Sequence, residues 1–214
     1  MSGCCAQEKR FDGTAPAFRR VLWAVIAINA TMFVVEMVAG ALAGSQALQA
    51  DALDFLGDTA TYGLSLAVIG RSLLLRARAA LFKGLTLAAM GLWVVGATAW
   101  QVLVLGVPLA PVMGAVGLAA LAANLTSVML LMRYKDGDAN VRSVWLCTRN
   151  DAIGNIAVLG AAGAVWFFVS PWPDLIVAFV MAGLFLSSAL QIVRQALAEQ
   201  AEARAASALA GVGD

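Results

Sequence analysis

The chain has 214 residues, of which 62% are hydrophobic and 13% charged, with a mean hydropathy of +0.85 and a net charge of +1. This composition excludes a soluble globular domain, a disordered chain and a nucleic-acid-binding protein built on basic patches. The sequence contains no histidine, which excludes Ser-His-Asp and Cys-His catalysis and imidazole metal ligands. We therefore expect a membrane protein whose chemistry uses carboxylates, amides, hydroxyls or thiols.

Six apolar runs are long enough to cross a hydrocarbon core of about 30 Å, which takes about 20 helical residues. They cover residues 21–43, 45–70, 83–105, 109–132, 144–170 and 174–194. The sequence thus predicts an all-α membrane protein whose six transmembrane helices form one domain, residues 21–194. Residues 1–20 are expected to be a cytoplasmic N-terminal tail, and residues 195–214 a short cytoplasmic C-terminal tail with a frayed helix.

The basic residues predict the topology, because Lys and Arg in short loops stay cytoplasmic. Of the 14 Lys and Arg, 13 lie before the first run, between runs two and three or four and five, or after the sixth, counting Lys83 at the start of run three and Arg194 at the end of run six. The connections between runs one and two, three and four, and five and six contain no Lys or Arg. We therefore expect both termini in the cytoplasm and a multi-pass protein of a bacterial inner membrane. The exception, Arg149 in the fifth run, is close enough to the cytoplasmic edge to snorkel.

The three cysteines are expected to be free thiols. Cys4 and Cys5 are adjacent, and vicinal cysteines rarely bridge, whereas Cys147 lies in the fifth run far from both. Two interpretations of the adjacent pair stay open. The pair either captures soft metal ions in the cytoplasm or belongs to an unstructured tail.

Three aspartates interrupt the second run, although placing one Asp at the centre of a spanning helix costs about 2.5 to 3.5 kcal/mol. Asp51, Asp54 and Asp58 are spaced i, i+3 and i+7, so they fall within about 60° of one another on one helical face. Acids inside membranes favour a functional role. The structural alternative is that they make interhelical hydrogen bonds or pair with Arg149.

The fifth run carries the complementary polar face. Cys147, Asp151 and Asn155 are spaced i, i+4 and i+8. With about 1.5 Å per residue and the expected topology, Asp58 and Asp151 both lie near mid-membrane. Carboxylates with a thiolate suit a divalent, borderline-soft metal ion, and crowded carboxyls hold protons until a metal displaces them. We therefore expect a site that exchanges protons for metal.

The second run resembles a motif of the cation diffusion facilitator family of metal transporters. The segment QALQADALDFLGD, residues 46–58, is similar to the family's second-span motif, in which a His or Asp precedes an Asp by four positions. Asp54 and Asp58 occupy these positions. The resemblance, which covers the whole six-span region, implies that both are metal ligands.

The fifth run resembles the family's fifth-span motif. The ligand Asp of that motif aligns with Asp151 in the segment DAIGNIAV. The family's other ligand, four residues earlier and commonly His or Asp, falls on Cys147. The implied ligand set is therefore Asp54, Asp58, Cys147 and Asp151, with the thiolate favouring Zn²⁺ or Cd²⁺ and leaving Mn²⁺, Fe²⁺ and Co²⁺ open.

The resemblance also implies a homodimer that exports divalent metal from the cytoplasm in exchange for protons, by alternating access. Family members generally carry a cytoplasmic metal-sensing domain after the sixth span. This chain is expected to be a short form without it, so that dimerisation uses membrane helices.

Four further polar residues are candidates for supporting roles. Asp51 is either an acid of the ion pathway, an alternative ligand or a group facing water. Asn155 is expected to orient a ligand, and Asn150 to face another helix. Glu36 in the first run either helps proton movement or bonds to a neighbouring helix.

These observations predict a secondary transporter with no bound cofactor, because the divalent metal is its cargo. The partners are metal ions, protons and the lipid bilayer, and no nucleic acid. The alternative is a non-transporting helical bundle whose buried polar groups fix its packing. An intramembrane enzyme is the least favoured class, because no cleavage-associated motif accompanies the two central acids.

Overall fold

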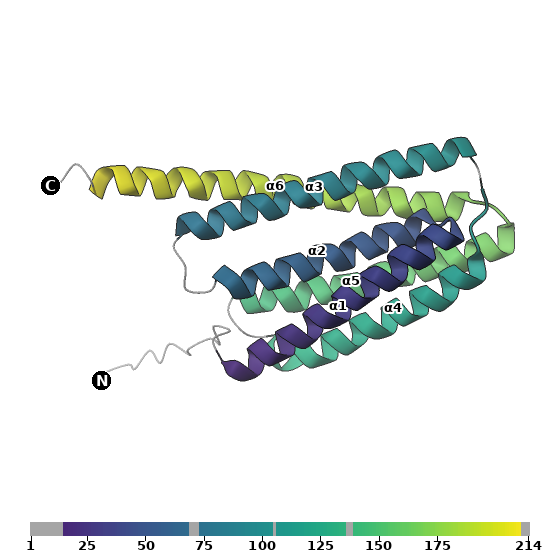
Figure 1. Cartoon of the computed structure of the whole chain (residues 1–214), viewed down its shortest axis with the longest axis horizontal. Helices are drawn as coiled ribbons and strands as arrows, with labels where there is room; N and C mark the ends of the chain where they lie inside the picture. The colour runs from purple at the N-terminus through teal and green to yellow at the C-terminus, as the bar shows by residue number, and fades with distance from the viewer. Residues whose placement is uncertain (1–14, 69–72, 105, 136–138, 211–214) are drawn as a thin grey trace, which may run out of the picture.

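The computed structural model describes residues 15–68, 73–104, 106–135 and 139–210, in parts as backbone only. These residues form six long α-helices and one short 3-10 helix, with no strand among them (Figure 1). The elements are α1 (Pro16–Ala43), α2 (Gln46–Val68), α3 (Leu73–Val104), α4 (Ala110–Leu131), η1 (Met132–Tyr134), α5 (Ala139–Phe168) and α6 (Trp172–Ala210). The prediction of an all-α protein with six long helices is confirmed.

Several helices extend beyond the apolar runs that predicted them. α1 already begins at Pro16, a residue suited to the first helical position. α3 begins at Leu73, within the basic segment before the third run. α6 continues to Ala210 through the segment expected to be a frayed tail. Hydropathy predicts which residues lie in the bilayer, but it does not predict where a helix ends. Ala, Arg, Lys and Glu are strong helix formers and can continue a helix outside the bilayer.

Five of the six helices are long and apolar enough to cross a membrane, which makes the chain a multi-pass membrane protein. α2 is the exception, because each 18-residue stretch of it contains Asp51, Asp54 and Asp58. It nevertheless lies inside the bundle beside α1 and α5 (Figure 1).

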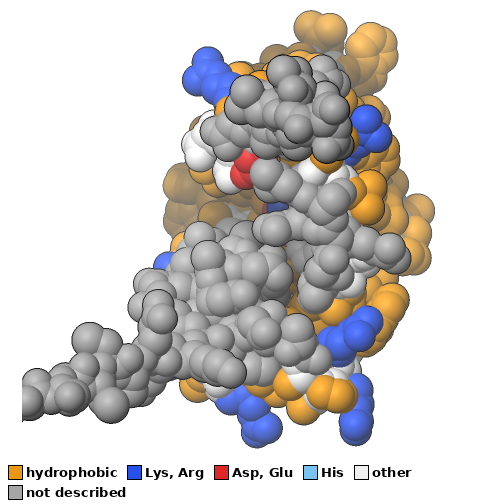
Figure 2. All heavy atoms as spheres, turned by 90° about the vertical axis from the view of Figure 1, so that its left-hand side faces the viewer, with side chains coloured by type: hydrophobic (Ala, Val, Ile, Leu, Met, Phe, Trp, Pro, Cys, Tyr) orange, Lys and Arg blue, Asp and Glu red, His pale blue; other side chains and the backbone are white. Residues whose placement is uncertain are grey.

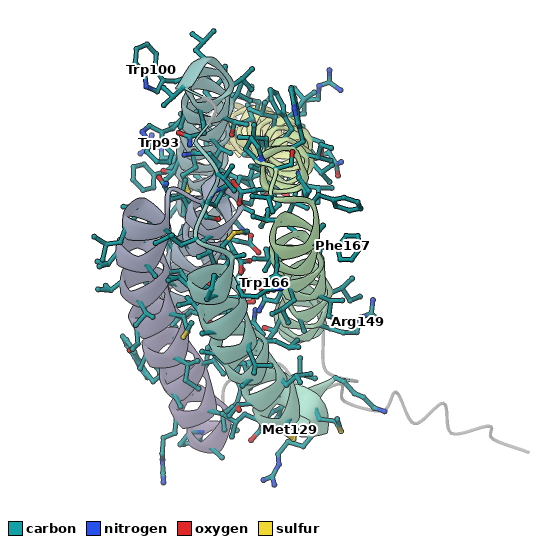
Figure 3. The ribbon with its side chains drawn as sticks, turned by 90° about the vertical axis from the view of Figure 1, so that its right-hand side faces the viewer. Trp93, Trp100, Met129, Arg149, Trp166 and Phe167 are labelled. Carbon is teal, nitrogen blue, oxygen red and sulfur yellow. The ribbon has the colours of Figure 1, made fainter. Side chains whose placement is uncertain are left out.

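The outer surface of the bundle is apolar. Trp93, Trp100 and Phe167 are exposed and extend away from the helices (Figure 3). The start of α1 and the end of α6 lie at the same end of the bundle (Figure 1). Lys and Arg side chains surround this end, as Figure 2 shows. We call it the basic end.

The helices pack in two groups. In one group α1 packs on α2 and α4, and α5 packs on α4 and α2; in the other, α3 packs mainly along α6 (Figure 1). Two glycines of α3 permit its close approach to α6. A Cβ atom on Gly84 would lie 2.8 Å from Cγ2 of Val193, and one on Gly91 would lie 2.9 Å from Cγ of Leu186.

The turn between α1 and α2 has defined caps. Gly44 ends α1 with φ +69°, a left-handed conformation that favours glycine. The next residue, Ser45, caps α2, since its hydroxyl accepts a hydrogen bond of 3.1 Å from the backbone N–H of Leu48. This turn lies at the end of the bundle opposite the basic end.

Candidate metal site

The acidic face of α2 divides into two environments. Asp54 and Asp58 are half-buried and line a cavity of about 850 Å³ between α2, α3, α5 and α6. Asp51, one turn before Asp54, is 1% exposed and does not line this cavity. Of the three acids predicted to share one helical face, only Asp54 and Asp58 therefore line the cavity.

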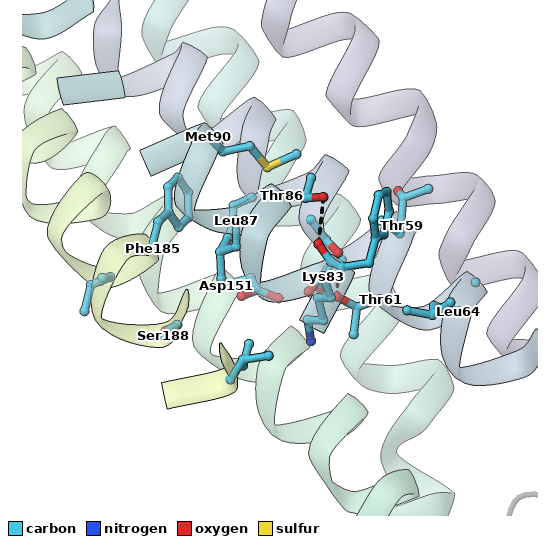
Figure 4. A pocket seen from close by; sticks show the side chains of 18 of the residues that line it. Thr59, Thr61, Leu64, Lys83, Thr86, Leu87, Met90, Asp151, Phe185 and Ser188 are labelled. Atoms are coloured by element: carbon cyan, nitrogen blue, oxygen red, sulfur yellow. Dashed lines mark hydrogen bonds between the residues drawn. The ribbon is translucent and has the colours of Figure 1, made fainter. Parts of the chain in front are cut away.

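Asp151 of α5 lies at the same cavity (Figure 4). Its carboxyl lies near enough to those of Asp54 and Asp58 to act on both. Three of the four residues that the sequence predicts as ligands thus line one cavity.

The cavity extends from the acids toward the basic end of the bundle. Its inner part contains Met90 of α3 and Phe185 of α6, and its lining reaches Ala67 near the end of α2 and Gln195 of α6. Lys83 of α3 also lines it (Figure 4). The acids and residues nearer the basic end therefore line one cavity.

Lys83 is a functional candidate that sequence reasoning missed. It was expected only as a cytoplasmic topology signal, yet its charge interacts with the carboxylate of Asp58. A lysine beside the acids balances negative charge when no metal is present. The only sequence signal for this role was its place at the edge of an apolar run.

Tyr62 is a second functional candidate that the sequence analysis did not predict. It is fully buried, and its hydroxyl donates a hydrogen bond to Oδ2 of Asp58. The hydroxyl of Thr148 on α5 lies 3.0 Å from the same Tyr62 oxygen. The phenol therefore links the carboxyl of α2 to α5. Its position four residues after Asp58, on the same face, is the signal that could have indicated it.

Glu36 and Asp51 are brought together by the packing of α1 on α2. Glu36 is 0% exposed, its charge acts on that of Asp51, and neither of its carboxyl oxygens has a hydrogen-bond partner in the described part of the chain. Asn155 of α5 is also buried, and neither polar atom of its amide has a hydrogen-bond partner in the described part of the chain. Neither Glu36 nor Asn155 lines the cavity.

The side chains of Cys147 and Asn150 lie outside the described residues, although their backbone belongs to α5. Among the side chains that are described, no group of three or more His, Cys, Asp or Glu stands close enough to hold a metal ion. Arg149 is exposed and extends away from the bundle (Figure 3), so it does not face the acids of α2.

Comparison with known proteins decides the family. The sequence matches the cation efflux transmembrane domain over residues 22–73 and 75–199, which is most of the chain. The chain belongs to the cation efflux family. This confirms the resemblance found in its second and fifth runs, and the family is one of cation efflux proteins and not of enzymes.

Two curated proteins are similar to this chain. The zinc transporter ZitB of Escherichia coli (strain K12) is 29% identical over 202 residues, which cover 86% of this chain and 63% of ZitB. The zinc transporter ZitB of Shigella flexneri matches with the same values. The chain therefore spans less than two thirds of the length of these relatives.

Proposed function

We propose that the chain exports a divalent metal ion, Zn²⁺ or Cd²⁺, from the cytoplasm in exchange for protons. The observation that carries this proposal is the meeting of Asp54, Asp58 and Asp151 at a cavity inside the bundle. Carboxylates are ligands for divalent cations, and protons held between them compete with the metal. The name of the similar transporters supports zinc as the cargo.

In this proposal, Cys147 is the fourth ligand. It precedes Asp151 by four residues in α5, which puts both on one helical face. A thiolate with carboxylates favours a borderline-soft ion over Mg²⁺ or Ca²⁺. Asn155, one turn beyond Asp151, would orient a ligand through its amide. Metal binding then requires the four ligands to close around the ion.

The direction of transport follows from the proposed topology. The basic end is taken as cytoplasmic, because Lys and Arg stay on that side. The cavity then receives metal from the cytoplasm and releases it at the opposite end once that end opens. We include in the proposal a homodimer formed through membrane helices.

Equilibrium binding of Zn²⁺ to the purified protein tests the ligand set. We expect about one high-affinity ion per chain, and a loss of at least roughly tenfold in affinity for Asp54→Asn and Asp58→Asn. Glu199→Gln, which changes a carboxylate on the distal part of α6, serves as the control and keeps the parent affinity. Equal affinity in all four proteins would favour the alternative, a bundle whose acids only fix helix packing.

A further inference from the structure

The hydroxyl of Tyr62 reaches Asp58 from outside the metal cavity. Asp58 lines the cavity, whereas neither Tyr62 nor Thr148 belongs to its lining. The phenol donates its hydrogen bond to one particular oxygen of Asp58, Oδ2. One of the two carboxylate oxygens is therefore already bound by a group that lies behind the cavity wall, and Oδ1 is the oxygen without this bond.

A second hydroxyl sets the direction of this hydrogen bond. Oγ1 of Thr148 on α5 lies 3.0 Å from the phenol oxygen of Tyr62. A phenol has one proton to donate, and an ionised carboxylate can only accept. When the phenol donates to Asp58, the hydroxyl of Thr148 therefore donates to the phenol oxygen. Tyr62 and Thr148 are both fully buried, so bulk water does not compete for either bond.

The ring of Tyr62 is fixed by the apolar core near the basic end of the bundle. It belongs to a buried cluster built from three helices, whose other members are Phe18, Leu22, Val25 and Ile26 of α1, Leu66 of α2 and Leu131 of α4. A ring in a close-packed core has little room to move. The hydroxyl is therefore held in one place, and its hydrogen bond holds Oδ2 of Asp58 there as well.

The number of oxygens that a carboxylate offers favours some metal ions over others. Zn²⁺ in proteins is almost always four-coordinate and tetrahedral. Mn²⁺ favours six oxygen ligands in octahedral geometry, and larger hard ions often bind both oxygens of one carboxylate. The proposed ligands supply four donor atoms only when each carboxylate uses a single oxygen; they are Asp54, Asp58, Cys147 and Asp151. An Asp58 with one oxygen already engaged suits a tetrahedral ion.

We propose that Tyr62 is a positioning residue that restricts Asp58 to one metal-binding oxygen and so selects Zn²⁺ over ions that need more than four ligands, such as Mn²⁺. This inference rests on the proposed function, in which Asp58 is a metal ligand. It assigns part of the metal selectivity to a residue that does not touch the ion.

Binding of Zn²⁺ and of Mn²⁺ to the purified full chain tests the proposal. Tyr62→Phe keeps the ring and removes the hydroxyl, so Oδ2 of Asp58 becomes available to the ion. We expect the ratio of the Kd for Mn²⁺ to the Kd for Zn²⁺ to fall at least roughly tenfold. A merely loosened site would weaken both ions alike and leave this ratio unchanged. Tyr134→Phe removes the hydroxyl of the only other tyrosine and should keep the parent ratio.

The visible spectrum of bound Co²⁺ reports the coordination geometry. Tetrahedral Co²⁺ absorbs visible light much more strongly than octahedral Co²⁺ does, so geometry can be read from the intensity. We expect strong bands from the parent and from Tyr134→Phe. Tyr62→Phe should give clearly weaker bands, because the ion gains oxygen ligands.

A parent-like Kd ratio or a parent-like Co²⁺ spectrum in folded Tyr62→Phe would overturn the inference. If Tyr62→Phe does not fold, the parent spectrum decides: tetrahedral Co²⁺ supports the inference, and six-coordinate Co²⁺ contradicts it. No Zn²⁺ binding by the folded parent would instead contradict the proposed function.

Discussion

The carboxylate of Asp174, at the start of α6, accepts a hydrogen bond of 2.6 Å from the hydroxyl of Ser45 at the start of α2. The backbone N–H groups of Gln46 and Ala47 donate to the same carboxylate, at 2.8 and 3.1 Å. An anion suits the N-terminus of a helix, where N–H groups are unsatisfied. Asp174 therefore joins α6 to α2 at the end of the bundle opposite the basic end, which is the end that has to open if the proposed export of metal is correct.

Replacing Asp174 with Asn should destabilise the protein by about 2 kcal/mol, because hydrogen bonds to a charged acceptor are stronger than neutral ones. An amide N–H₂ group would also face backbone donors. The expected result is a melting temperature in detergent lower by roughly 5 °C. Glu199→Gln, which changes the hydrogen bond from Gln195 near the surface, should shift it little. Equal melting temperatures for parent and Asp174→Asn would contradict the assigned cap.

Tyr62→Phe removes the hydroxyl between Asp58 and Thr148 while keeping the ring in its buried place. We expect the KM for Zn²⁺ transport to rise roughly tenfold, since a misplaced ligand weakens metal binding. The maximal rate and the melting temperature should change much less. Thr148→Val leaves the bond to Asp58 in place and should raise KM less. A fall in maximal rate at constant KM would contradict a role in positioning Asp58.

The packing of α3 on α6 predicts opposite effects at two glycines. Gly84→Ala should lower stability by about 1 to 3 kcal/mol, because its new Cβ would lie 2.8 Å from Val193. Gly96→Ala, also in α3, meets nothing within 4 Å and should raise stability by up to about 1 kcal/mol through helix propensity. Melting curves in one detergent compare the two. Equal shifts would show that α3 does not pack as described.

Cys147→Asp tests the proposed thiolate ligand. Carboxylates favour harder ions than thiolates do, so the variant should lose preference for Cd²⁺ relative to Mn²⁺ by roughly tenfold or more. Competition between the two ions for binding gives the ratio. Cys4→Ser serves as the control and should keep the parent ratio. An unchanged ratio in Cys147→Asp would remove the thiol from the ligand set.

The sequence predicted the helices and the meeting of α2 with α5 for identifiable reasons. Long apolar runs predict spanning helices, and helical spacing puts Asp54 and Asp58 on one face. The rise per residue gives the depth of each side chain in the membrane, so the sequence could predict that Asp58 and Asp151 lie at the same depth. The resemblance to the family motifs then predicted which of these acids are metal ligands.

Contacts across helices were not predictable in the same way. The neighbours of Glu36 depend on how α1 is rotated about its axis relative to α2. The sequence does not predict this rotation, because the helix is apolar both where it faces lipid and where it faces other helices. The links of Tyr62 to Thr148 and of Asp174 to Ser45 join residues far apart in sequence. The start of α3 was missed because a basic segment continues the helix beyond the apolar run, whereas a helix after residue 195 was expected, though a frayed one.

Zinc uptake into vesicles tests the central claim most directly. The purified protein is reconstituted around an internal Zn²⁺ dye, a pH gradient is imposed, and the parent is compared with Asp151→Asn, with Glu199→Gln as the control. The account predicts uptake that needs the gradient, persists in the control, and falls by at least roughly a hundredfold in Asp151→Asn. Uptake by folded Asp151→Asn at the parent rate, or no gradient-dependent uptake by the folded parent, would contradict it.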